Sequence, residues 1–392
     1  MNSYNQPIWT RSFLSIFMAS LLVFTAFYLL LPTLPLYLIN GLHISAGYTG
    51  IVLAVYTVAA LIIRPFTGFM LDLYGRKWIY LSGLILFSLL FSGYMIVATL
   101  AGMLIIRFVH GLFWGITTTS GSTIAVDLVP AQRRGEGLGY FGLASTIPMA
   151  IGPMLGLQLV SGGNYNQMFL VSIILAVVGV AFAFGIKYPE LPVHTAKFSV
   201  RNLFEVSALP VAAILFINMI TYGGVVSFVS LYVKETGVGN AGMFFMNYAI
   251  GIALSRIVSG KIFDRRGPGI ITTLAFISII IGFLILALYH NNVSFLFAAF
   301  MMGLGGGVLF PICQAMVNNM VLPHRRGAAN STLFTVLDLG IGCGMMLTGY
   351  LAEHTGLVNA FIACSIINVV ALILFMTYSN RHYVKHKLNQ TS

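Results

Sequence analysis

Apolar residues run along this chain in long stretches of about 20 residues or more, separated by short polar segments. A helix of about 20 apolar residues spans the roughly 30 Å hydrocarbon core of a bilayer. The first stretch has no charged residue and no small-residue cleavage site, so we interpret it as a retained span and not a signal peptide. The pattern predicts an all-α membrane protein with twelve transmembrane helices, at 12–39, 48–70, 78–99, 101–126, 137–160, 166–187, 208–233, 241–262, 269–289, 293–320, 328–351 and 357–379.

Composition supports the same class. The chain is 58% hydrophobic and 7% charged, whereas soluble domains average about 25% charged residues. A soluble enzyme, a nucleic-acid binder and a disordered protein are therefore excluded, and the net charge of +11 is not concentrated in a basic run on a polar face. Cys313, Cys343 and Cys364 lie in apolar segments without metal-site or disulfide spacing. We expect no metal, no cofactor and no nucleic-acid partner.

The basic residues fall almost entirely on one side of the twelve-span arrangement. The other side holds only Lys234, and Arg64, Arg107 and Arg256 lie within spans. Because basic loops face the cytoplasm, the asymmetry predicts that both termini are cytoplasmic, in the inner membrane of a bacterial cell. The residues on the basic side are Arg11, Arg76, Lys77, Arg133, Arg134, Lys187, Lys197, Arg201, Lys261, Arg265, Arg266, Arg325, Arg326, Arg381, Lys385 and Lys387.

The chain repeats itself at an offset of 192 residues. The pairs that share this offset are Arg64 and Arg256, Gly68 and Gly260, Asp72 and Asp264, Gly75 and Gly267, Arg134 and Arg326, Gly135 and Gly327, and Gly152 and Gly344. The repeat predicts two pseudo-symmetric six-helix halves, 1–187 and 208–392, joined by a cytoplasmic linker at 188–207. Apolar and charged residues alternate in this linker, so we expect it to form a short helix on the membrane surface.

Three segments resemble motifs of the major facilitator superfamily. Residues 68–77 resemble motif A, and Arg107–Gly111 with Gly115 resembles motif B. Gly152, Pro153 and Gly156 resemble motif C, the signature of the family's antiporters, although Leu157 stands where a second glycine is usual. The resemblance implies the twelve-helix facilitator fold and alternating access, with two halves moving about a central site.

Motif A is the candidate gate. Gly68 and Gly75 permit close packing and a sharp turn, and Asp72, Arg76 and Asp127 could together form an ionic latch at one end of the bundle. The resemblance implies that such a latch holds the halves closed on the cytoplasmic side. A solvated basic loop would explain Arg76 and Lys77 but not the acidic residues. The repeat predicts a second gate in the other half, at Arg256, Gly260, Asp264 and Gly267.

Charged residues within spans are costly and are therefore functional candidates. Arg107 and His110 share one helix face, and a histidine titrates near neutral pH. Asp338 is the only acidic residue deep within a span, roughly 15 Å from the start of its helix. We interpret Arg107, His110 and Asp338 as proton-coupling residues. The alternatives are a hydrogen bond between packed helices for His110, snorkelling to the outer surface for Arg107 and a permanently protonated acid for Asp338.

Polar and aromatic residues within the predicted inner helices are candidates for the substrate cavity. We expect about half of them to face it. They are Tyr28, Tyr56, Trp114, Asn218, Tyr222, Asn247, Gln314 and Asn318. No GxxxxGK[ST] motif occurs, so nothing indicates ATP hydrolysis, and we expect no catalytic residues and no enzyme.

Together these features predict a secondary transporter, a monomer in the lipid bilayer that exports small amphipathic organic molecules (a drug, sugar or metabolite) in exchange for protons. The alternative is a proton-coupled symporter that imports a sugar or organic acid, because motif C is imperfect and the first span lacks an acidic residue. A membrane sensor that transports nothing is a third reading, which would require a signalling domain or a long tail.

Overall fold

The computed structural model describes residues 6–160, 162–189 and 203–388. Within these residues, twelve helices are long and apolar enough to cross a membrane, which confirms the number of predicted spans. The surface helix predicted in the linker falls mainly on 190–202, outside the described residues.

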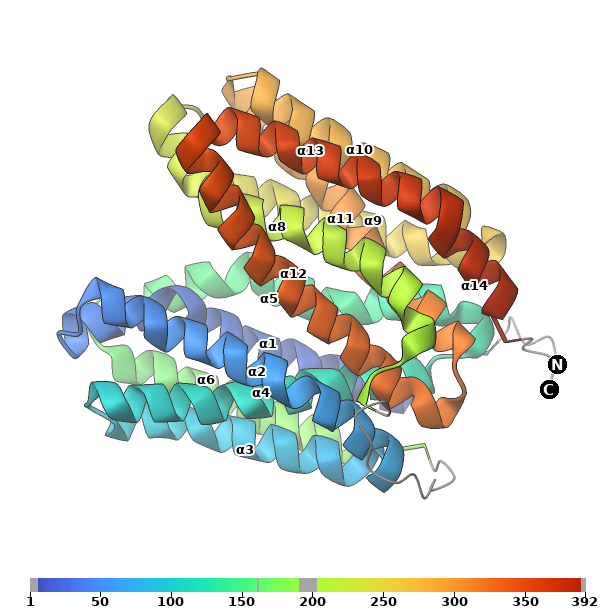
Figure 1. Ribbon diagram of the computed structural model, residues 1–392. Coiled ribbons are helices and arrows are strands. Elements are labelled where there is room, and N and C mark those ends of the chain that lie inside the picture. The colour runs from blue at the N-terminus through green and yellow to red at the C-terminus, as the bar shows by residue number, and fades with distance from the viewer. Residues whose placement is uncertain (1–5, 161, 190–202, 389–392) are drawn as a thin grey trace.

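The first six spans form one bundle (Figure 1). Their helices are α1 (Arg11–Leu36) with the π-helical turn η2 (Tyr37–Gly41), α2 (Ala46–Tyr74), α3 (Arg76–Ile96), α4 (Leu100–Leu128), the 3-10 turn η3 (Ala131–Arg133) with α5 (Arg134–Val160), and α6 (Tyr165–Phe184).

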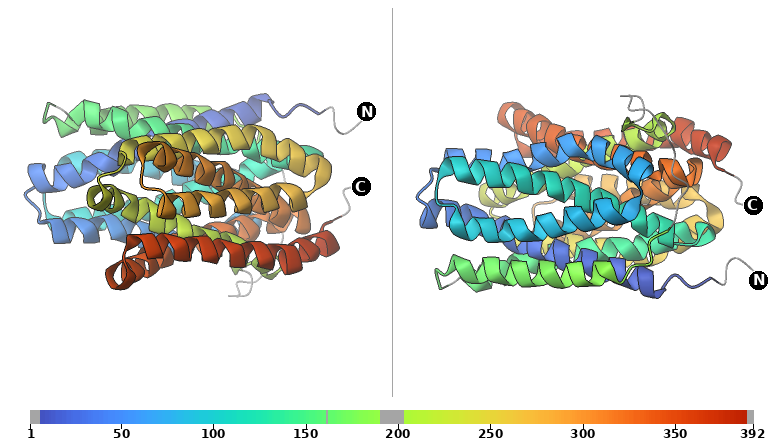
Figure 2. Two further views of the ribbon diagram at one scale, coloured as in Figure 1. Left: turned by 90° about the horizontal axis from the view of Figure 1, so that it is seen from above. Right: turned by 90° about the horizontal axis from the view of Figure 1, so that it is seen from below.

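The other six spans form the second bundle, which lies against the first along α5, α2, α9 and α12 (Figures 1 and 2). Its helices are η4 (Val206–Ala208) with α8 (Leu209–Thr236), α9 (Ala241–Arg266), α10 (Pro268–Leu288), α11 (Asn292–Met320), η5 (Pro323–Arg325) with α12 (Arg326–Thr355), and α13 (Leu357–Leu374) continued by η6 (Phe375–Ser379) and α14 (Asn380–His386).

Each bundle has its own apolar core. Large side chains such as Phe87, Phe91 and Phe169 fill the first, and Phe276, Phe283 and Phe361 fill the second. The second core extends to Ala125, Val126 and Leu138 of the first half. Because each half buries most of its apolar surface internally, the contact between the halves can also hold polar groups.

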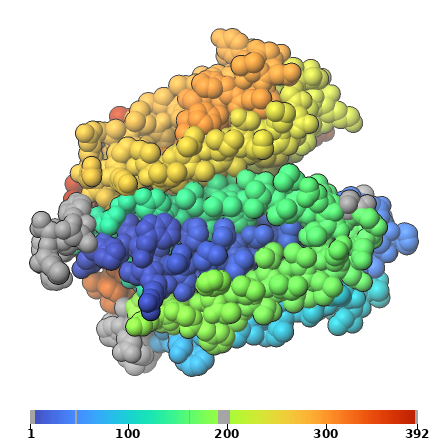
Figure 3. All heavy atoms as spheres, turned by 180° about the vertical axis from the view of Figure 1, so that it is seen from behind, coloured from blue at the N-terminus to red at the C-terminus, as the bar shows by residue number. Residues whose placement is uncertain are grey.

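Both chain ends lie at the same end of the molecule, which we call the terminal end (Figure 1). Arg133, in the turn between α4 and α5, donates a hydrogen bond to the carbonyl oxygen of Gln6 at 2.9 Å. The backbone N–H of Leu388 donates to the carbonyl of Asn319, at the end of α11, also at 2.9 Å. At the opposite end the two halves diverge, and a cleft opens between them (Figure 3).

The helices that carry the repeat extend beyond their apolar stretches. α2 and α9 continue through Asp72 and Asp264 and end at Gly75 and Gly267, where φ is +86° and +75°. A positive φ favours glycine at these positions, because glycine has no Cβ that would clash with the backbone. α5 and α12 begin a few residues before the predicted spans, since their first turns are polar and an apolar pattern does not detect them.

Candidate functional site

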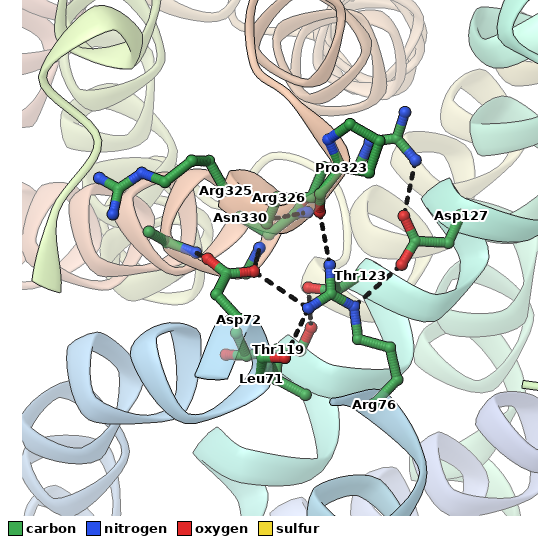
Figure 4. Close-up of polar contacts among 12 residues, drawn as sticks. Leu71, Asp72, Arg76, Thr119, Thr123, Asp127, Pro323, Arg325, Arg326 and Asn330 are labelled. Atoms are coloured by element: carbon green, nitrogen blue, oxygen red, sulfur yellow. Dashed lines mark hydrogen bonds and ion pairs between the residues drawn. The ribbon is translucent and has the colours of Figure 1, made fainter. Parts of the chain in front are cut away.

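The predicted latch lies between the halves at the terminal end (Figure 4). The two carboxylate oxygens of Asp72 accept hydrogen bonds from the backbone N–H groups of Gly327 and Ala328, each at 2.8 Å. These groups form the first turn of α12, where the helix dipole stabilises a negative charge. Arg76 Nη1 lies 3.0 Å from Asp72 Oδ1, so the carboxylate joins a cation of its own half to a helix end of the other half.

A second carboxylate completes this layer. Arg76 Nε donates to Asp127 Oδ2 at 3.0 Å, and Arg326 Nη1 donates to Asp127 Oδ1 at 2.7 Å. Arg76 also donates to the carbonyl of Pro323 at 2.8 Å. The structure therefore brings Asp72, Arg76 and Asp127 together as the sequence predicted. It adds Arg326, which the sequence does not assign to the latch, although Arg326 is the repeat partner of Arg134.

The second half repeats part of the arrangement. Asp264 accepts hydrogen bonds from the N–H groups of Gly135 and Glu136, both at 2.8 Å, at the first turn of α5. Arg134 donates to the side chain of Asn319, which occupies the position of Asp127 at the 192-residue offset. The predicted second gate thus combines a carboxylate on a helix end with an arginine bonded to an amide. Beside them, the Glu136 carboxylate pairs with Arg133 at 2.7 Å and with Lys261 of α9 at 3.7 Å.

Glycines allow these helix ends to meet. A Cβ added at Gly68 would lie 2.6 Å from the carbonyl oxygen of Gly327, and one at Gly260 would lie 2.5 Å from the backbone nitrogen of Glu136. Any larger residue would separate α2 from α12 or α9 from α5. The sequence predicts that Gly68 and Gly260 belong to the gates. The structure gives the reason, because each glycine lies in close backbone contact with a helix of the other half.

Asp338 is not isolated within the membrane. Arg64 Nε donates to Asp338 Oδ2 at 2.7 Å, which joins α2 of one half to α12 of the other. Arg64 Nη1 also donates to the hydroxyls of Thr118 and Thr119 on α4, at 2.9 and 3.2 Å. The sequence singled out Asp338 but not its partner, although Arg64 was the first residue of the repeat.

Arg256, the repeat partner of Arg64, lies two turns away from Asp264 on α9. Its Nη1 donates to the carbonyl of Gly142 and to the hydroxyl of Thr146 on α5. Its Nε is fully enclosed and has no hydrogen-bond partner among the residues that the structure describes. Arg256 therefore joins the halves in the core, one layer deeper than the gate formed by Asp264.

Arg107 and His110 lie in an aromatic pocket within the first half. The guanidinium of Arg107 lies 4.0 Å above the ring of Tyr56, and among the described residues no carboxylate pairs with it. His110 is fully buried, and its Nδ1 lies 2.9 Å from the hydroxyl of Tyr94. Tyr56, which contacts both side chains, also lies within electrostatic range of Arg64 and Asp338.

The predicted cavity residues separate into two groups. Asn218, Gln314 and Asn318 are buried in hydrogen bonds between helices, with Asn368, Ser122 and Asn330 respectively, and Asn247 bonds to the carbonyl of Met243 in its own helix. The aromatic members behave differently. Tyr28 and Tyr222 are half-buried, while Tyr56 and Trp114 stack with Phe27 at centroid distances of 5.6 and 4.3 Å.

Motif C packs within the first half. A Cβ at Gly152 would lie 2.6 Å from the Cβ of Tyr28, and one at Gly156 would lie 2.5 Å from the carbonyl oxygen of Leu29. Gly152, Pro153 and Gly156 therefore let α5 approach α1 closely at the depth of Tyr28. Motif C controls the contact of two helices beside the cleft and supplies no charged group.

A family model described as the Major Facilitator Superfamily matches residues 16–294 and 275–391. The chain belongs to the major facilitator superfamily. Members of this family and the relatives below are transporters, not enzymes.

Two curated bacterial relatives align over nearly the whole chain. The staphylopine export protein of Staphylococcus aureus is 23% identical over 384 residues, 92% of this chain and 94% of the relative. A homolog of the multi-drug resistance efflux pump PmrA from Lactococcus lactis is 24% identical over 394 residues, 95% and 96% of the two chains.

Solved structures share the fold at low sequence identity. The human organic anion transporter MFSD10 superposes with a TM-score of 0.82 at 17% identity, covering 94% of this chain and all of that one. The proton:xylose symporter XylE gives a TM-score of 0.76 at 14% identity, with 94% and 95% covered.

Proposed function

We propose that this facilitator exports small amphipathic organic molecules in exchange for protons, by alternating access between its two halves. The observation that carries the proposal is the distribution of contacts between the halves. Charged and backbone groups join them at the terminal end, and a cleft separates them at the other (Figure 3). This is the geometry of one end state of a carrier whose halves rock about a central site.

The proposed direction of transport rests on charge and on the relatives. Basic residues gather at the terminal end, which supports a cytoplasmic position for both termini in a bacterial inner membrane, with the cleft open to the outside. Both bacterial relatives described above are named as exporters or efflux pumps. We propose that a single chain suffices, because the cleft and both gates lie within one molecule.

The proposed proton coupling rests on two ionisable side chains within the spans, His110 and Asp338. His110 faces Tyr56, Tyr94 and the cation of Arg107, and Asp338 faces Arg64. A proton that neutralises Asp338 would release Arg64 and loosen the contact of α2 with α12. Proton binding would thus favour the opening of the terminal end.

Inverted membrane vesicles with an acidic lumen test the direction and the coupling together. An antiporter accumulates a radiolabelled solute in such vesicles, whereas a symporter releases a preloaded solute. A panel of one anion, one cation and one neutral solute (2-naphthoate, ethidium and N-phenyl-1-naphthylamine) covers the charge classes. Import by symport is the second candidate, because α1 has no acidic residue. If neither accumulation nor release of any of these solutes follows the pH gradient, transport driven by protons is refuted.

Variants of the aromatic pocket test the coupling residues. Arg107→Ala should abolish accumulation driven by the pH gradient, because it removes the cation beside His110. His110→Ala should shift the pH dependence and leave exchange without a gradient. The exposed Lys234→Ala removes one positive charge outside the pocket and should behave as wild type. If both pocket variants keep the wild-type pH profile, proton coupling resides elsewhere.

A further inference from the structure

The pseudo-symmetry of the core is broken around one pair of arginines, and the break leaves a buried cation without a carboxylate. Arg64 and Arg256 hold the same place in the two halves, and each meets a helix of the opposite half. The surrounding backbone contacts are also equivalent. Ser331 bonds to the carbonyl of Arg64, and Gly139, at the same 192-residue offset, lies directly against the carbonyl of Arg256.

The side chains around the two arginines are not equivalent. Arg64 has a carboxylate at Asp338, two threonine hydroxyls and the ring of Phe334 at 4.7 Å. At the 192-residue offset, Thr146 replaces Asp338 and Gly142 replaces Phe334. The two threonines are replaced by Phe310 and Pro311, which have no side-chain oxygen. Arg256 thus retains its charge without the groups that neutralise Arg64.

Burial makes this charge costly unless something else compensates it. Arg256 is 91% buried (9% exposed), its Nε has no partner, and no described carboxylate forms an ion pair with it. The guanidinium fills the space beside Gly142, where an added Cβ would lie 2.7 Å from its Cζ. A buried cation with an unused N–H favours a negatively charged partner.

Three tyrosines from both halves lie near this cation. Tyr28 on α1, Tyr222 on α8 and Tyr248 on α9 are near enough to interact electrostatically with Arg256. Their hydroxyls make no hydrogen bond to any residue that the structure describes, so each can donate one to a ligand. The ring of Tyr28 also lies beside two phenylalanine rings, with centroid distances of 5.3 Å to Phe27 and 6.5 Å to Phe24.

We infer that Arg256, with Tyr28, Tyr222 and Tyr248, forms the binding site for the carboxylate of an amphipathic aromatic anion, and that such anions are the substrate class. The inference deepens the proposed function. The claim that the bound anion is also transported rests on that function. The guanidinium binds the carboxylate through Nη2, which, unlike Nε, is not enclosed and makes no hydrogen bond to a described residue, and the tyrosine hydroxyls donate to the same oxygens. The aromatic surface beside Tyr28 receives the apolar part. Arg256, assigned from sequence to a gate, is in this view a binding residue.

Equilibrium binding of radiolabelled 2-naphthoate and of uncharged 2-naphthamide tests the site without any need for transport or a proton gradient. The protein is the full chain in nanodiscs of phosphatidylcholine. Wild type should bind the acid at least about tenfold more tightly than the amide, since charge-assisted hydrogen bonds typically contribute that much or more. Equal affinity for the two, or no binding of the acid, overturns the inference.

Two variants locate the charge that is responsible. Arg256→Gln should weaken acid binding by about tenfold to hundredfold and leave amide binding unchanged. Thr146→Asp keeps Arg256 but gives it a carboxylate partner equivalent to Asp338 beside Arg64. This variant should weaken acid binding as much as Arg256→Gln does. Arg266→Gln, at the exposed end of the same helix, makes the same change in net charge as Arg256→Gln and should leave both affinities unchanged.

The outcomes separate this inference from the proposed function. If the Thr146→Asp variant binds the acid like wild type, the inference is wrong even where Arg256→Gln misfolds. If the acid binds through Arg256 but no gradient moves it, the anion site stands and proton-coupled transport fails. If a cation is exported and the acid does not bind, transport stands and the anion site fails.

Discussion

At the scale of single residues, Arg64 and Asp338 neutralise one another where a lone charge would be unstable. Arg64 is buried and the Asp338 side chain is 13% exposed, and their ion pair of 2.7 Å crosses from one half to the other. Breaking a buried pair by removing one partner costs about 3–5 kcal/mol, because the other charge remains without compensation. Removing both charges together should therefore be much less damaging than removing either.

This argument predicts the behaviour of a double-mutant cycle. Asp338→Asn should lower thermal stability and nearly abolish gradient-driven transport, and Asp338→Glu should be partly active. Arg64→Gln combined with Asp338→Asn should recover most of the lost stability, as measured by melting temperature in detergent. If Asp338 carries the coupling proton, the double variant recovers stability but not gradient-driven transport. If transport recovers as well, Asp338 does not carry the coupling proton and serves only to neutralise Arg64.

At the scale of elements, the gate depends on how closely α2 approaches the first turn of α12. The carboxylate of Asp72 can reach two backbone N–H groups only because Gly68 and Gly327 have no side chains between the helices. A Cβ at Gly327 would lie 2.6 Å from Asp72 Oδ1, closer than real Cβ contacts. The closed terminal end is therefore sensitive to a single methyl group.

We predict that Gly327→Ala weakens closure of the terminal end and reduces transport severely. Gly342→Ala, in the same helix, is the matched control, because no atom of the described residues lies within 4 Å of the added Cβ. Alanine favours the helix by roughly 1 kcal/mol over glycine, so the control should be as stable as wild type or more so. The two variants are compared by melting temperature and by uptake into vesicles at equal expression. Equal transport by both would contradict the close-contact account of the gate.

At the scale of the whole molecule, the layer of charges at the terminal end holds one of two global arrangements. Asp72 contributes charge-assisted bonds to both Arg76 and the first turn of α12. Hydrogen bonds to charged groups contribute about 1.5–3 kcal/mol each, enough to shift a two-state equilibrium by tenfold or more. Asp72→Asn should therefore shift the protein toward the state that is open at the terminal end.

Distances between spin labels measure this shift. Ile96 and Val293 are exposed at the open end, and Trp78 and Val384 are exposed at the terminal end. With the native cysteines replaced by alanine, Asp72→Asn should shorten the first distance and lengthen the second. Glu353→Gln removes an exposed carboxylate at the open end and should change neither. A change at one end alone would argue against rigid rocking of the two halves.

The sequence by itself determined the class, the number of spans and the internal repeat of this protein. Helix spans follow from the length of apolar stretches, and the latch of Asp72, Arg76 and Asp127 follows from residue types at helix ends, so both are local properties of the chain. The repeat also located Arg64 and Arg256 before their partners were known.

Only the tertiary structure decided which charges meet. Asp338 and Arg64 are 274 positions apart, and Arg326 joins Asp127 across 199 positions, so no local pattern could pair them. Likewise, Asn218, Gln314 and Asn318 were polar residues in inner helices, but only helix packing buried them in hydrogen bonds away from the cleft. The physical reason is that the energy of a buried charge or amide depends on what surrounds it in space, and those neighbours come from other helices.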